Sequence, residues 1–118
     1  MAYADGFVIP IPKKNVEAYR KIARKASKVW MEHGALEYYE CVGDDLAVPA
    51  PMAGFPALAK LKKNETVVFA WIVYKSKAHR DRVNAKVMKD PRMHMSPKDM
   101  PFDLSGMACG GFKVIVKA

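Results

Sequence analysis

Three histidines are the side chains of this chain best suited to proton transfer. Imidazole titrates nearest to neutral pH, so each ring is a candidate general acid or base. We expect His79 on the inward face of a helix, near the mouth of a cleft, and rank it first. A hydrogen-bonded core histidine accounts for the same position. His33 is expected at a helix C-terminus, where a cationic ring can satisfy the last carbonyls.

Asp5 is the carboxyl in the most unusual setting, because it interrupts an apolar strand in phase with Phe7. A carboxyl that is partly desolvated there suits a general base. The alternative is an exposed residue at the frayed start of the strand. Glu40 has the same ambiguity, because it shares a strand face with Leu36 and Tyr38. The catalytic candidates are therefore Asp5, His79 and His33.

Several aromatic side chains could line an apolar pocket for a ligand with a ring. Packing in the core or at an interface is the commoner use of such residues. No histidine, cysteine and carboxylate cluster has the spacing of a metal site, and no cofactor can be named. A phosphate-binding loop is not expected either, because Gly110-Gly111 lacks the following helix and lysine. The ligand-binding candidates are Trp30, Trp71, Phe55 and Tyr74.

The elements that must position these residues follow the order strand, helix, strand, strand, helix, strand. The strands are expected at residues 3–11, 36–42, 65–75 and 107–117. Asn15 and Ser76 are suited to cap the two helices. Gly34 and Pro91 are expected to end them.

On the second helix, helical spacing predicts an inward stripe that contains His79, Val83, Val87 and Met88. Arg80 is expected outside, among the basic residues. Residues 44–58 form a long, proline-rich and apolar connection that we expect to fold back on the body.

The third strand is the most informative segment, because both of its faces are apolar and each needs a cover. Right-handed crossovers predict a ferredoxin-like βαββαβ fold of the α+β class, with a four-stranded antiparallel sheet and both helices on one face. We expect a second copy to cover the other face, which gives a homodimer through the sheet faces and a dimeric α+β barrel. The second and fourth strands lie at opposite edges, so Cys41 and Cys109 are too far apart to bond.

The 118 residues fit a single domain over 1–118. The formal net charge is +8, and the basic residues concentrate on the two expected helices, where solvated faces are the simplest interpretation. No apolar run reaches membrane-spanning length, and we expect no secretory signal at the start. Two cysteines without metal-type spacing favour a cytoplasmic protein with reduced thiols.

Several segments, taken in order across nearly the whole chain, resemble the YbaA-like family of small bacterial proteins. They are Asp5-Gly6-Phe7-Val8, Val29-Trp30-Met31-Glu32-His33-Gly34, Glu65-Thr66-Val67-Val68-Phe69, Tyr74-Lys75-Ser76 and Gly110-Gly111-Phe112-Lys113. The resemblance implies the dimeric α+β barrel superfamily and a homodimer. It implies no activity and no catalytic residues, because the family is a domain of unknown function. Other members of that superfamily use the cleft between sheet and helices, which is an analogy of fold alone.

Three functions are therefore open. The first is a protein that binds or transforms a small molecule in the sheet–helix cleft, roofed by residues 44–58, with Asp5 and His79 in proton transfer. The second is a structural or regulatory homodimer without catalysis. RNA binding ranks below both, because residues 65–71 lack the Lys/Arg-Gly-Phe pattern of RNA-recognition strands.

Overall fold

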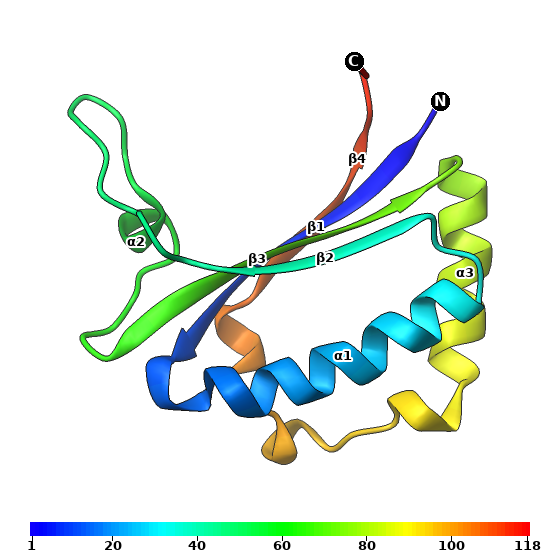
Figure 1. Cartoon of the computed structure of the whole chain (residues 1–118), viewed down its shortest axis with the longest axis horizontal. Helices are drawn as coiled ribbons and strands as arrows, with labels where there is room; N and C mark the ends of the chain where they lie inside the picture. The colour runs from blue at the N-terminus through cyan, green and yellow to red at the C-terminus, as the bar shows by residue number, and fades with distance from the viewer.

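Four strands form one antiparallel sheet in the order β2-β3-β1-β4 (Figure 1). The computed structural model describes all residues 1–118. The strands are β1 Tyr3–Pro12, β2 Glu37–Val42, β3 Glu65–Tyr74 and β4 Ala108–Lys113. The sheet edges are β2 and β4, as predicted, and the cysteines on them, Cys41 and Cys109, are free and exposed.

Two long helices, α1 (Val16–Glu32) and α3 (Lys77–Lys89), lie on one side of the sheet. The short α2 (Phe55–Leu58) lies on the other side (Figure 1). We call these two sides the helix-side face and the outer face. None of the helices combines the length and the apolar character needed to cross a membrane.

The helix termini agree with the sequence in three of four places, among them the end of α3 just before Pro91. Ser76 caps α3, because its hydroxyl accepts a hydrogen bond from the His79 backbone N–H at 3.1 Å. Gly34 follows α1 with a φ of 115°, a conformation that glycine adopts without steric cost. The prediction for Asn15 was wrong: a 3-10 turn already precedes α1, and the Asn15 side chain instead donates to the Pro101 carbonyl at 2.8 Å.

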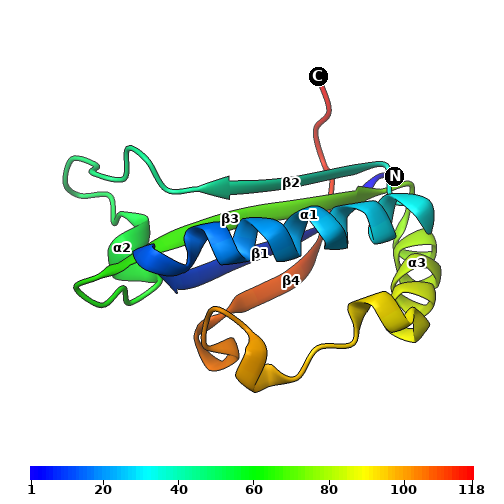
Figure 2. The same ribbon diagram turned by 60° about the horizontal axis from the view of Figure 1, so that its bottom comes forward.

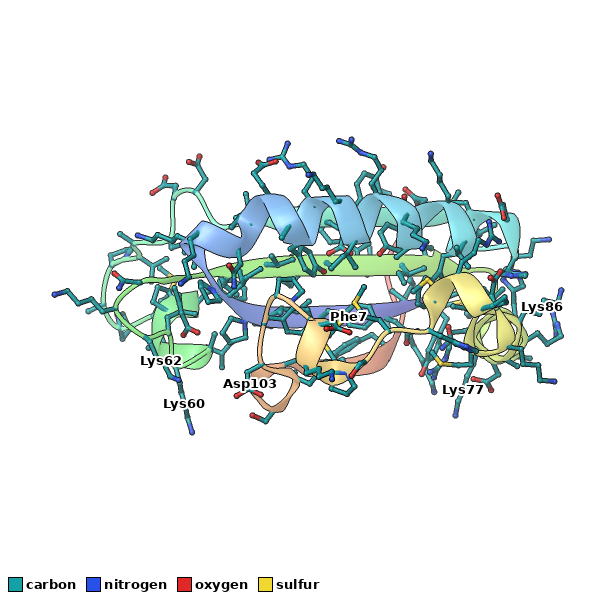
Figure 3. All side chains as sticks on the ribbon, turned by 90° about the horizontal axis from the view of Figure 1, so that it is seen from below. Phe7, Lys60, Lys62, Lys77, Lys86 and Asp103 are labelled. Atoms are coloured by element: carbon teal, nitrogen blue, oxygen red, sulfur yellow. The ribbon has the colours of Figure 1, made fainter.

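The helix-side face holds the core in two clusters. One joins Val29 of α1 and Val83 of α3 to Ile72 of β3, and the other joins β1 and β3 to Phe102. Phe7 packs against both clusters and lies near the middle of the molecule in Figure 3. A central strand residue therefore connects the two halves of the core.

The connection from α3 to β4 covers the part of the helix-side face that α3 leaves open. α3 runs across the end of the sheet, and it is seen end-on in Figure 3 where α1 is seen from the side. The connection passes along the sheet with three 3-10 turns (Figure 2). It inserts Phe102, which is 8% exposed and packs edge-to-face on Tyr19 at 5.7 Å between ring centroids. Asn15 fastens the same segment to the start of α1.

The outer face is aromatic and only partly covered. Tyr39 of β2 stacks on Trp71 of β3 at 5.0 Å between ring centroids, and Phe69 lies 5.6 Å from Trp71. Phe55 of α2 meets Phe69 at 5.7 Å. Phe69 is still 43% exposed, and Phe112 of β4 is 61% exposed. One face of the third strand therefore lacks a complete cover within the chain.

Two neighbouring glycines in β4, Gly110 and Gly111, lie on opposite faces of the sheet. A Cβ on Gly111 would overlap the Tyr3 hydroxyl and lie 2.9 Å from Arg80 Nη2, so these two side chains can lie against β4 only because Gly111 has no side chain. Gly110 points to the outer face, where a Cβ would meet nothing closer than Phe112 at 3.9 Å. A close approach that requires glycine therefore occurs at Gly111 alone.

Candidate functional site

A cavity of about 460 Å³ opens between α1 and β2 on the helix-side face. This volume lies in the range of small-molecule sites. Apolar side chains form much of its wall: Val16, Ala23, Val42 and Val68. The polar lining comes from Tyr19, Arg20, Arg24 and Ser27 of α1 and from Tyr38 and Glu40 of β2.

The centre of the polar lining is a carboxyl held by two tyrosines. Tyr19 donates its hydroxyl proton to Glu40 Oε1 at 2.7 Å, and Tyr38 donates to Glu40 Oε2 at 2.7 Å. Tyr38 and Glu40 are two residues apart, so they share one face of β2. Both carboxyl oxygens of Glu40 therefore accept a hydrogen bond from a tyrosine.

Burial, reinforced by the negative charge of Glu40, raises the pKa of Tyr19 and of Tyr38 well above the usual tyrosine range. Both phenols therefore keep their protons at neutral pH and act as hydrogen-bond donors to Glu40. Neither is poised to become a phenolate base.

Two arginines of α1 lie at the rim of the cavity and are exposed. Arg20 pairs with Glu17 at 3.3 Å, whereas Arg24 makes no ion pair. Ser27 donates its hydroxyl to the Arg24 carbonyl at 2.7 Å. The rim is therefore positive, and the deeper part of the cavity is negative.

A second polar cluster surrounds Asp5, which is only 7% exposed on the helix-side face of β1. Arg80 of α3 lies 3.5 Å from its carboxyl, measured from Nη1 to Oδ1. Arg80 Nη2 also donates to the Tyr3 hydroxyl at 3.2 Å, and the guanidinium centre lies 4.9 Å from the Tyr3 ring centroid. The prediction that Arg80 points outward was wrong, because a carboxylate on a buried face needs a cation beside it.

Met88, which we expected to face inward, is 65% exposed. Val83 and Val87 face inward as predicted, and Arg80 and Asn84 join them on the inward face of α3. The basic side chains Lys77 and Lys86 point away from the body at this end of the molecule (Figure 3).

Trp30 and Tyr74 are joined to each other in the core. Trp30 Nε1 donates to the Tyr74 hydroxyl at 3.1 Å and to Asn84 Oδ1 at 3.3 Å, and Tyr74 donates to Asn84 Oδ1 at 3.2 Å. Tyr74 has no exposed surface. Burial, followed by the charge of Asp5, raises the pKa of Tyr74 above its usual range. Neither ring lines the cavity between α1 and β2.

The two leading histidines have partners within the chain. His79 Nδ1 accepts the Lys75 backbone N–H at 3.0 Å, which leaves the proton of a neutral ring on Nε2. Burial and the charges of Lys75, Arg82 and Lys86 lower the pKa of His79. His33 Nε2 lies 2.9 Å from Asp90 Oδ2. No contact brings Asp5 and His79 together.

Asp90 belongs to a network that fastens the end of α1 to the end of α3. Arg92 bonds to Asp90 at 2.8 Å and to Glu32 at 2.6 Å. Hydrogen bonds from Arg92 and then His33 hold the pKa of Asp90 far below its usual range. His33 therefore contributes to the contact between the end of α1 and the end of α3.

The four aromatic candidates do not line a common pocket, which corrects the sequence interpretation. Trp30 and Tyr74 lie on the helix-side face, whereas Trp71 and Phe55 lie on the outer face. Residues 44–58 do not roof the cavity between α1 and β2, because Phe55 packs on Phe69 across the sheet. The chain direction after β2 takes this connection over the outer face, and no local sequence signal reports that direction.

A second cavity, of about 450 Å³, lies at the outer face between α2 and β4. Lys60, Lys62 and Asp103 border it, and the two lysines lie close together at one end of the molecule (Figure 3). Asp103 is engaged by Ser105, from its hydroxyl at 2.8 Å and its backbone N–H at 2.9 Å. The lysines are exposed, so this cavity has no convergent set of buried polar groups.

The family model described as "Protein of unknown function (DUF1428)" matches residues 2–104. The chain belongs to this family. It is also 43% identical over 116 residues to "Uncharacterized protein YbaA" of Escherichia coli (strain K12), with 98% of each chain covered. The YbaA protein of Shigella flexneri gives the same values. These descriptions name no activity, so the comparisons establish the family and leave the function to be argued from the site.

The DUF1428 chain also resembles a solved structure, "De novo designed protein Foldit4", with a TM-score of 0.50 and 9% identity. The match covers 97% of this chain and 99% of that one, and it concerns the fold alone. Within the DUF1428 match lie all the residues of the α1–β2 cavity, whereas β4 lies beyond it. Sequence reasoning flagged Glu40 by its phase in β2 and missed Tyr19, its partner on α1.

Proposed function

We propose that this DUF1428 protein binds a small molecule in the cavity between α1 and β2. The observation that carries the proposal is a cavity of about 460 Å³ whose apolar wall surrounds the Tyr19–Glu40–Tyr38 hydrogen bonds. A few convergent polar groups in an apolar concavity are typical of a ligand site. Asp5, His79 and His33 stay predictions for proton transfer, because their contacts lie away from this cavity.

Denaturation midpoints measured across a panel of metabolites test this proposal. A ligand that binds only the folded state stabilises it, by about 2.7 kcal/mol at a free concentration near 100 Kd. We expect at least one compound to raise the midpoint in proportion to the logarithm of its concentration. A panel without any stabilising compound would favour the structural or regulatory homodimer.

Matched tryptophan variants locate the site. Val42 lines the cavity and Val48 lies in the connection after β2, and each is 45% exposed. Val42→Trp fills the cavity from its open side and should abolish the ligand-induced shift. Val48→Trp adds the same volume elsewhere and should leave that shift unchanged. Loss of the shift in both variants, or in neither, would contradict the assignment of the site.

We further propose the ferredoxin-like βαββαβ arrangement and a homodimer in which two outer faces pack to form a dimeric α+β barrel. The strand order and the placement of α1 and α3 on one side support the arrangement. The exposed aromatic side chains of the outer face support a second copy as its cover, since apolar patches of this kind mark interaction sites. The free cysteines, Cys41 and Cys109, support a cytoplasmic location.

The shape of the outer face favours a copy of itself as the partner. One row across the sheet runs Tyr39, Trp71, Gly6 and Gly110, from edge β2 to edge β4. In this row bulky residues occupy the β2 half and glycines occupy the β4 half, where the Phe112 ring lies beside Gly6 and Gly110. A two-fold axis along the strands sets β2 of one protomer over β4 of its partner. In this self-complementary contact, the aromatic half of each copy meets the glycine half of the other.

A further inference from the structure

We infer that the ligand of the α1–β2 cavity is an organic monoamine, whose ammonium group meets Glu40 and whose apolar body lies along the valine wall. The inference rests on the proposed function, because it names the ligand class of that same cavity. It follows from the donors, the charges and the apolar surface that the lining residues present.

The hydroxyl protons of the cavity wall are already used within the chain. Tyr19 and Tyr38 each donate to Glu40 at 2.7 Å, and Ser27 donates to the Arg24 carbonyl at 2.7 Å. A hydroxyl has one proton but two acceptor lone pairs. The deep polar groups therefore offer a ligand only acceptors, so the ligand must supply the donors.

The carboxylate of Glu40 has no cationic partner. The ion pairs of the chain involve Glu17, Glu32, Asp5, Asp81 and Asp90, and none involves Glu40. Glu40 is half-buried, and a desolvated charge is normally paired. Its two oxygens keep acceptor capacity beyond the two tyrosine bonds. An ammonium group supplies both the missing positive charge and the missing donors.

The other lining residues restrict the chemistry of the part of the ligand beyond its ammonium group. Val16, Val42 and Val68 offer apolar contact for a hydrocarbon chain or ring. Arg24, at the rim, has no ion pair and repels a second positive charge. A monoamine is therefore favoured over a diamine, and a carboxylate at the far end of the ligand is compatible with the rim.

Three probes of nearly equal size test this inference: 2-phenylethylamine, 2-phenylethanol and phenylacetate. Their affinities are measured by calorimetry, with amide NMR shifts to locate each probe. The chain carries a net charge of +8, so nonspecific attraction favours phenylacetate. We expect the opposite order, with 2-phenylethylamine tightest by about tenfold or more, because a hydrogen bond to a charged group is the stronger kind. 1,4-Diaminobutane should bind more weakly than n-butylamine.

The Glu40→Gln variant removes the charge and keeps the shape. It should lower the affinity for 2-phenylethylamine about tenfold or more and change that for 2-phenylethanol less than about twofold. Glu37→Gln is the matched control, because Glu37 is exposed on the other face of the same strand and should have no effect. If Glu40→Gln does not fold, the order of the probes on the wild-type protein still decides.

The outcomes separate this inference from the proposed function. Binding of 2-phenylethanol or phenylacetate in the cavity without a preference for the amine overturns the amine assignment and leaves a ligand site. Amine binding that maps away from Tyr19, Tyr38 and Glu40, or that survives in Glu40→Gln, also overturns it. If these probes and the metabolite panel all fail to bind, the proposed function fails as well.

Discussion

The two faces of the sheet are covered to different degrees. On the helix-side face, three deep polar groups have partners: Asp5 has Arg80, Trp30 has Tyr74, and Glu40 has two tyrosines. On the outer face the residues are mostly apolar, and Phe69 and Phe112 remain 43% and 61% exposed. Both faces are built from alternate residues of the same strands. The difference teaches that this chain covers one side of its sheet more fully than the other, which supports the proposed dimer.

The largest expected effect comes from the cation that completes the helix-side face. Arg80→Met leaves Asp5 buried without its partner and should lower the free energy of unfolding by about 3 kcal/mol or more. Urea unfolding measures this loss. The Asp5→Asn/Arg80→Met double variant should recover part of the stability, because the uncompensated charge is gone. A double variant as unstable as the sum of the two single variants would contradict the coupling.

Substitutions at the two adjacent glycines of β4 test the two faces of the sheet separately. Gly111→Ala forces a Cβ onto the Tyr3 hydroxyl and should destabilise the fold by about 1–3 kcal/mol. Gly110→Ile adds a side chain whose Cβ has no neighbour closer than 3.9 Å within the chain, and it extends into the space that the partner subunit would occupy. We expect sedimentation to find a folded monomer for Gly110→Ile at micromolar concentration and a dimer for the wild-type protein. A wild-type monomer would remove the proposed dimer.

The smallest expected effect is a pH dependence on the helix-side face. The pKa of His79 is lower in the folded chain than its ordinary value of 6.5, so protonation favours the unfolded state. The contribution of His79 to stability is complete above about pH 6.5 and is lost as the pH falls through the window below it. His79→Asn should therefore flatten the fall in urea midpoint between about pH 7 and pH 5.5. The control His94→Asn, at an exposed ring, should keep the wild-type slope.

Period-two alternation was enough to assign the faces of the strands. It placed Asp5 with Phe7 and Glu40 with Tyr38, and the structure confirms both pairs. The Ser76 cap and the turn at Gly34 were equally local and equally predictable. Signals of this kind depend on neighbours in sequence, which a single chain displays.

The remaining errors involve partners that are distant in sequence. Arg80 was placed outside because charge usually indicates solvent, although Asp5, 75 residues earlier, needed a cation. The partnership of Tyr19 with Glu40 requires the position of α1 over β2, which spacing does not report. The connection after β2 was assigned to the wrong face for the same reason, since either side of the sheet accepts an apolar segment.

The central position of β1 has a consequence for synthesis on the ribosome. β1 is translated before the other strands, yet it pairs with β3 and β4, and its Tyr3 hydroxyl accepts a hydrogen bond from Arg80 of α3. The nascent chain must therefore carry an unpaired apolar segment until residues 65–74 emerge, and the sheet closes only after residues 108–113 follow. During that interval, chaperones have access to the very strand that the finished protein buries in its middle.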